Sequence, residues 1–143
     1  YFYYLSPKNK DLLNNILNQT TLSERIYWFF FGNIVKKSMY ELMAITKENI
    51  EESKKVIFDV FKKASEKLNS NPNSLTEESF FTPTDLAFCA LGSIAVFPEK
   101  YSGNTVKMGS IESFPTDYQE IIKFCRNTTA GKFILNCYET KRL

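Results

Sequence analysis

Apolar residues recur at the spacing of an α-helix along most of this chain, beginning near its N-terminus. Pro7 opens the first of these patterns, and proline is favoured at the first position of a helix. Leucine and isoleucine residues follow at helical intervals, and a run of aromatic residues extends the pattern past Gly32. The pattern predicts one long or kinked helical element over residues 8–44, with Gly32 as its weakest point.

A second apolar stripe, with charged residues on the opposite face, begins at Thr46. Its acidic residues come early and its lysines late, which is the order that the dipole of a helix favours. Residues 69–79 lose the pattern and contain Pro72 with several asparagines and serines, a composition typical of a loop. We therefore predict an amphipathic helix from Thr46 to about residue 68. Its apolar stripe consists of Ile50, Ile57, Val60, Phe61, Ala64 and Leu68.

Residues 86–97 contain no charged side chain. A helix that is apolar on all sides must be covered on all sides, so this segment is predicted to be the central, fully buried helix of a bundle. Pro98 ends the segment, and the loop predicted over residues 99–114 is longer than most connections. Two further helical patterns complete the chain, one starting at Pro115 and one near Thr128.

The start of the central helix carries the strongest local signal in the sequence. Thr82 and Asp85 are spaced as a capping box, in which the hydroxyl accepts from the Asp85 amide and the carboxylate accepts from the Thr82 amide. Pro83 stands at the first helical position, where no amide hydrogen is needed. Phe81 and Leu86 occupy the two positions of a hydrophobic staple. This context favours structural capping over a catalytic role for Asp85.

Length and composition indicate one helical domain over residues 1–143. Of the 143 residues, 43% are hydrophobic, which is enough for a core. No segment shows strand alternation of useful length, so the predicted fold class is all-α, a bundle of five to six helices. The formal charge is only +2, and lysine and glutamate alternate along the chain, which argues against nucleic acid as a partner.

The side chains that most often carry catalysis or bind metals are scarce. Histidine is absent, which removes the commonest general base and the commonest metal ligand. Cys89, Cys125 and Cys137 form no CxxC pair and lie in apolar stretches, so we interpret them as buried free thiols and predict no metal site. Free thiols also favour a reducing, cytoplasmic location. Two pairs of adjacent glutamates are predicted on an exposed helical face and in a polar loop, so no catalytic residue is predicted.

The apolar run over residues 26–35 has two interpretations. It is too short for a membrane span, which needs about 20 residues, and Arg25 and Lys36 flank it, so no membrane association is predicted. Packing within the core and between helices is the first interpretation, because aromatic side chains dominate core burial. The second is a surface that faces a ligand or another domain.

Several segments resemble the C-terminal helical domain of the glutathione transferase family. The central apolar helix with its capping box is similar to a segment that usually reads Thr-x-Ala-Asp-Leu in this family, with Thr84 in place of the alanine. The stretch from Arg126 to Lys132 and the Tyr-Glu-Thr-Lys-Arg ending resemble the closing segments of many members, with Thr129 where proline is common. The resemblance spans nearly the whole chain and is most specific from Phe80 onward.

The resemblance implies a helical bundle that follows a thioredoxin-like domain in most relatives. That preceding domain holds glutathione, the co-substrate, and activates its thiol, so this chain itself would carry no cofactor and no catalytic residue. Because the chain begins with a tyrosine, we expect it to be a fragment, a processed product or an expression product. Its first long helix would line an apolar pocket and supply part of a homodimer contact, with a hydrophobic-ligand or interdomain face formed by Tyr27, Trp28, Phe31 and Tyr40.

Two hypotheses follow from these observations. In the first, the chain is the hydrophobic-substrate-side and dimerisation domain of a glutathione-transferase-like protein, and it packs against its own N-terminal thioredoxin-like domain. In the second, it is a non-catalytic docking module that binds another protein, as helical domains of this type do in translation and tRNA-synthetase assemblies. A thioredoxin-like pattern encoded upstream of Tyr1 would favour the first.

Overall fold

Helices form all the regular structure in the part of the chain that this computed structural model describes, residues 20–99, 101 and 110–141. These ranges contain no strand, which confirms the all-α class. The prediction of one element over residues 8–44 is wrong at Thr20 and Thr21, which are not helical, because Thr21 caps a helix that begins at Leu22; residues 8–19 lie outside the described residues. The elements are α3 (Leu22–Leu42), α4 (Lys47–Ser70), α5 (Pro83–Val96), the short 3₁₀ helix η2 (Ile111–Ser113), α6 (Thr116–Asn127) and α7 (Thr129–Thr140).

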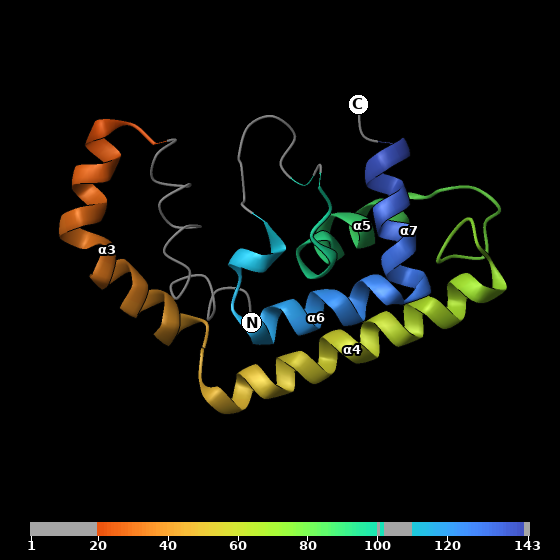
Figure 1. Cartoon of the computed structure of the whole chain (residues 1–143), viewed down its shortest axis with the longest axis horizontal. Helices are drawn as coiled ribbons and strands as arrows, with labels where there is room; N and C mark the ends of the chain where they lie inside the picture. Colours follow the sequence, from red (N-terminus) through yellow and green to blue (C-terminus); the bar gives the residue numbers. More distant parts are fainter. Residues whose placement is uncertain (1–19, 100, 102–109, 142–143) are drawn as a thin grey trace.

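Helices α3 and α4 are joined by a short, hydrogen-bonded corner. Thr46 caps α4, as the sequence predicts, because its hydroxyl accepts from the amide of Asn49. Ala44 has a φ of 46°, a left-handed conformation that non-glycine residues adopt at a cost of roughly 1–2 kcal/mol. Gly32 does not interrupt α3. Figure 1 shows α3 extending away from the start of α4 instead of running back along it.

The hydrophobic core lies between α4, α5, α6 and α7, which pack against one another (Figure 1). Helix α4 contributes most of the stripe that its sequence pattern predicts: Phe61, Ala64 and Leu68 are buried, whereas Val60 is 45% exposed. Aromatic pairs link the helices, with the rings of Phe58 and Phe124 centred 4.1 Å apart. No comparable packing joins α3 to another of the described helices.

Helix α5 is central in the sequence but is covered on one side only, so the prediction of a fully buried helix is wrong. Cys89 and Val96 face the core, whereas Leu86 is 58% exposed and Leu91 is 79% exposed. Helices α6 and α7 pack against α5, and in the described part of the chain no element covers the side that bears Leu91. An uncharged sequence therefore permits burial on all sides but does not ensure that a neighbour is present.

The C-terminal end of α5 is held by a side chain from α6. Phe97 ends the helix in the left-handed conformation, with a φ of 52°, and its ring is buried. The guanidinium of Arg126 donates to the carbonyl of Val96 at 2.7 Å and to the carbonyl of Phe97 at 2.6 Å. Two carbonyls that the helix itself cannot pair are thereby satisfied. The hydroxyl of Tyr118, also on α6, donates to the carbonyl of Ile94.

Helices α6 and α7 meet at a corner that has almost no connecting chain. Thr128 ends α6 and caps α7, since its hydroxyl donates to the carbonyl of Cys125 at 2.6 Å and accepts from the amide of Gly131 at 3.0 Å. The amide of Ala130 donates to the Ser65 hydroxyl at 3.0 Å, which ties the corner to α4. These bonds fix the direction in which α7 returns across the core.

Candidate functional site

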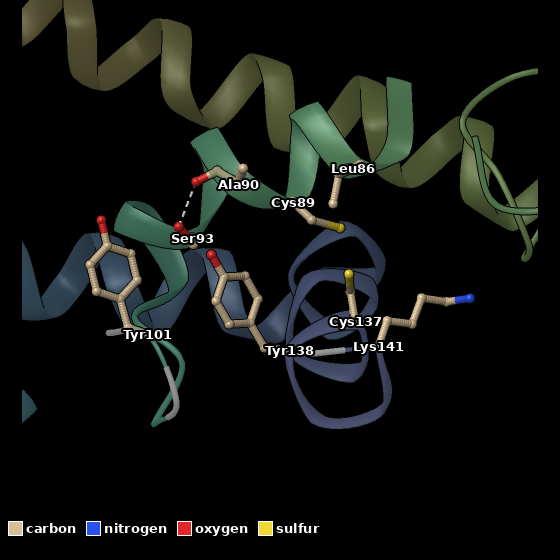
Figure 2. A pocket seen from close by; sticks show the side chains of 8 residues that line it. All are labelled: Leu86, Cys89, Ala90, Ser93, Tyr101, Cys137, Tyr138 and Lys141. Atoms are coloured by element: carbon tan, nitrogen blue, oxygen red, sulfur yellow. Dashed lines mark hydrogen bonds between the residues drawn. The ribbon is translucent and has the colours of Figure 1, made fainter. Parts of the chain in front are cut away.

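A pocket between α5 and α7, the α5–α7 pocket, combines apolar walls with polar and sulfur-bearing side chains. Its volume is about 410 Å³, within the range of roughly 300–1,000 Å³ that is typical of small-molecule sites. Figure 2 shows that the two helices supply opposite walls and that Tyr101 approaches from the segment after α5. The pocket is lined by Leu86, Cys89, Ala90, Ser93, Tyr101, Cys137, Tyr138 and Lys141.

Two thiols form part of the inner wall of this pocket. The sulfur atoms of Cys89 and Cys137 point toward one another from facing helices (Figure 2). Burial, followed by the neighbouring Cys137 thiol, raises the pKa of Cys89 well above its ordinary value, so it stays protonated at neutral pH. Burial likewise raises the pKa of Cys125 to about 12. All three cysteines are buried and free, which confirms the interpretation of them as buried free thiols. The protonated Cys89 thiol contributes an unreactive, apolar part of the pocket wall.

The polar groups of the pocket provide binding contacts and no nucleophile. The Ser93 hydroxyl donates to the carbonyl of Ala90 at 2.6 Å, and the sequence holds no histidine that could activate it. The Lys141 ammonium lies 4.5 Å from the centre of the Phe81 ring, a cation–π contact at the pocket wall. The arrangement can therefore hold an apolar body and attract an anionic group toward Lys141.

Asp85 lies beside this pocket at the centre of a buried hydrogen-bond network. Its carboxylate, which is 0% exposed, accepts from the amide of Thr82 at 2.7 Å and from the Thr82 hydroxyl at 2.6 Å. The amide of Asp85 donates back to the Thr82 hydroxyl at 3.4 Å. The carboxylate also accepts from the Ser74 hydroxyl at 2.7 Å and from the amide of Leu75 at 2.6 Å. It thus ties the loop before α5 to the start of the helix.

This network decides the ionisation state of Asp85. Burial alone would raise its pKa, but the hydrogen bonds from Leu75, Thr82 and Ser74 together outweigh burial and hold the pKa below its ordinary value. The carboxylate is therefore ionised at neutral pH and is unsuited to general-acid catalysis. Of the two staple residues, Phe81 stacks on the ring of Phe133 at 6.0 Å, and Leu86 is largely exposed at the wall of the α5–α7 pocket.

Replacing Thr82 by alanine is expected to lower the free energy of unfolding by roughly 1–2 kcal/mol, because the cap hydroxyl is lost. Thr82→Ser keeps that hydroxyl and should retain most of the stability. Thermal unfolding followed by circular dichroism measures both variants. Equal melting temperatures for Thr82→Ala and the unchanged protein would show that the hydroxyl contributes nothing.

The four aromatic residues predicted to form a ligand or interdomain face lie on α3, away from the α5–α7 pocket. Tyr27 is 58% exposed and Phe31 is 46% exposed, and their rings pack together at 4.9 Å. Trp28 and Tyr40 are half-buried, and the indole of Trp28 covers Gly32. These four residues therefore do not line the α5–α7 pocket, which is the cavity with polar side chains in its walls.

A second cavity, the α4–α5 groove, has almost entirely apolar walls. Its volume is about 380 Å³. The hydroxyl of Tyr118 is bonded to the carbonyl of Ile94, so the groove offers little polar recognition. The sequence pattern could not identify this groove, because it lies where none of the described elements covers α5. Its walls are formed by Val56, Ile57, Val60, Phe61, Phe88, Leu91, Gly92, Ile94, Ala95, Tyr118 and Ile121.

Comparison with known proteins identifies no similar protein for this chain. No protein-family model, curated protein or solved structure shows significant similarity to the chain. Within the described ranges, no three His, Cys, Asp or Glu side chains gather as a metal ion would require. No helix of those ranges has both the length and the apolar character needed to cross a membrane. The resemblance to glutathione transferases therefore stays a prediction.

Proposed function

We propose that this chain is the hydrophobic-substrate-side helical domain of a glutathione-transferase-like protein, and that the α5–α7 pocket receives the substrate. The observation that carries the proposal is the composition of the pocket, whose apolar walls surround a few polar groups without a nucleophile. Such a pocket suits binding, because apolar contact supplies affinity and a few polar groups fix orientation. The order of helices and the threonine–aspartate box at the start of α5 support the family assignment.

In this proposal the pocket binds an electrophile or conjugate with an apolar body and an anionic part. The apolar body would lie against Leu86, Cys89 and Ala90, and the anionic part would approach Lys141. Thiol activation would come from a thioredoxin-like domain encoded before Tyr1, since this chain has no histidine and the Cys89 thiol stays protonated. A cytoplasmic location, where glutathione is reduced, belongs to the same proposal.

Octanoate, which has an apolar chain and a carboxylate, is a suitable probe for this pocket. We expect calorimetric titration to detect its binding and Ala90→Trp to weaken that binding at least tenfold (about 1.4 kcal/mol), because the indole would fill the pocket. Ala87→Trp is the matched control, since Ala87 is an exposed alanine three residues earlier on α5 that does not line the pocket. Absence of binding, or equal loss in both variants, would count against the proposal.

A docking module is the second candidate function, and the exposure of α3 favours it. Phe29 is 82% exposed and Leu42 is 86% exposed, and large apolar patches on a protein surface usually mark interaction sites. The longer gene product distinguishes the two candidates. Conjugation of glutathione to a model electrophile supports the enzyme, whereas a stable complex with another protein and no conjugation supports the docking module.

A further inference from the structure

Helix α3 carries exposed apolar side chains that no other described helix covers. A row spaced by four residues runs along one face, and its members are Leu22 (74% exposed), Ile26 (52%), Phe30 (68%) and Ile34 (62%). Tyr27 and Phe31 add a second apolar face. A helix that is apolar on more than one side requires neighbours on more than one side.

The α4–α5 groove matches the part of this row from Ile26 to Ile34 in length and in pattern. Val56 and Val60 stand one turn apart on α4, and Leu91 and Ala95 stand one turn apart on α5. At a rise of 1.5 Å per residue, the groove wall from Phe88 to Ala95 is about 10 Å long, and the α3 row from Ile26 to Ile34 is about 12 Å long. Rows spaced by four residues on two helices interdigitate in the commonest class of helix packing.

The corner between α3 and α4 keeps the helix away from the groove of its own chain. The amide of Ile45 donates to the carbonyl of Tyr40 at 2.9 Å, and the side-chain amide of Asn49 donates to the carbonyl of Ala44 at 2.8 Å. Folding α3 back along α4 would require new backbone angles at this corner and the loss of these bonds. The corner therefore directs α3 away from the rest of α4 (Figure 1).

We propose that two copies of this chain form a dimer by reciprocal exchange of α3, so that the α3 row of each copy lies in the α4–α5 groove of the other. The two-fold arrangement is closed, because each copy gives one helix and receives one. Covering roughly 100 Å² on each of the three side chains Ile26, Phe30 and Ile34, and an equal area of groove, buries about 1,200 Å² over both contacts, at the lower end of the range for stable interfaces. The family resemblance also implies a homodimer contact by the first long helix, whereas the exchange into the groove rests only on α3 and the groove.

Complementation between two variants tests the exchange. Phe30→Glu damages the helix row, and Leu91→Glu damages the groove, so each variant alone has a defect in both contacts and should dimerise on the order of a hundredfold more weakly. In the equimolar mixture, a dimer made of one copy of each variant has one contact in which the helix row and the groove are both intact. Size-exclusion chromatography with light scattering should give twice 16.6 kDa for the unchanged chain, 16.6 kDa for each variant and the dimer mass for the mixture.

Leu86→Glu is the matched control, because Leu86 is exposed on α5 but lies outside the groove, and this variant should stay dimeric. A monomeric unchanged chain, a dimer in either damaged variant, or a mixture that stays monomeric would overturn the proposal. If a glutamate variant lacks helical circular dichroism, one copy with Phe30→Cys and another with Leu91→Cys replace it. Oxidation should link these two copies, and failure to link them faster than a Leu86→Cys copy would likewise overturn the exchange.

Discussion

Asp85→Asn is expected to lower the free energy of unfolding by about 3–5 kcal/mol, and the melting temperature by about 10 °C. The carboxylate accepts four hydrogen bonds in a site that is closed to solvent. An amide of the same shape would direct a donor toward other donors and leave at least one buried group unpaired. Chemical denaturation followed by circular dichroism measures the loss. A loss below about 1 kcal/mol would show that the network is not formed.

Glu24 provides a matched control, because it forms the same capping box with Thr21 on the exposed surface of α3. Glu24→Gln should change the melting temperature far less than Asp85→Asn, since water can replace the lost contacts.

The effect at Asp85 also depends on pH. Its pKa is lower in the folded chain than in the unfolded chain, so the carboxylate stabilises the fold above the unfolded pKa of about 3.9. This contribution is lost as the pH falls through the pKa that Asp85 has in the folded chain. The unchanged chain and the Asp85→Asn variant should then have similar free energies of unfolding.

Gly131→Ala is expected to lower the free energy of unfolding by at least about 3 kcal/mol, at the upper end of what overpacking costs. A Cβ at this position would stand 1.9 Å from the carbonyl oxygen of Cys125 and 3.0 Å from the Cα of Arg126. Both are backbone atoms at the corner between α6 and α7, so no side chain can move to make room. The corner itself would have to open, which would separate α7 from the core. Thermal melting and the yield of folded protein report this change.

Gly32→Ala distinguishes this effect from a general effect of adding a methyl group. Its Cβ would approach only the indole of Trp28, at 3.2 Å, and that side chain can shift. Alanine also favours a helix interior by about 1 kcal/mol over glycine, so the net change should be small. Equal destabilisation by both substitutions would contradict the explanation given for Gly131.

Helices α4 and α5 could be predicted because each has local signals for its start and its apolar face, whereas the pattern over residues 8–44 does not reveal the start of α3 at the Thr21–Glu24 capping box. Thr46 and the stripe of α4 lie within one segment, as do Pro83 and the start of α5. What surrounds each helix depends on distant residues, and this information is absent from a local pattern. Leu91 looks like a core residue in the sequence, yet no described helix covers it.

The candidate site shows the same division between local and distant information. The pairing of Thr82 with Asp85 follows from a spacing of three residues, whereas the bonds to Ser74 and Leu75 come from a loop ten residues earlier. The facing thiols of Cys89 and Cys137 lie on helices far apart in the sequence, and no spacing rule joins them. The aromatic run of α3 permits either core packing or a surface, and only the direction of the corner at Ala44 decides between them.

The hydrogen bonds from Arg126 to the end of α5 can form only after the later part of the chain has been synthesised. When the ribosome has produced Phe97, the carbonyls that Arg126 later binds still depend on water. At about 10 residues per second, the arginine follows roughly three seconds later. During this interval the end of α5 lacks the two hydrogen bonds that Arg126 provides in the folded chain.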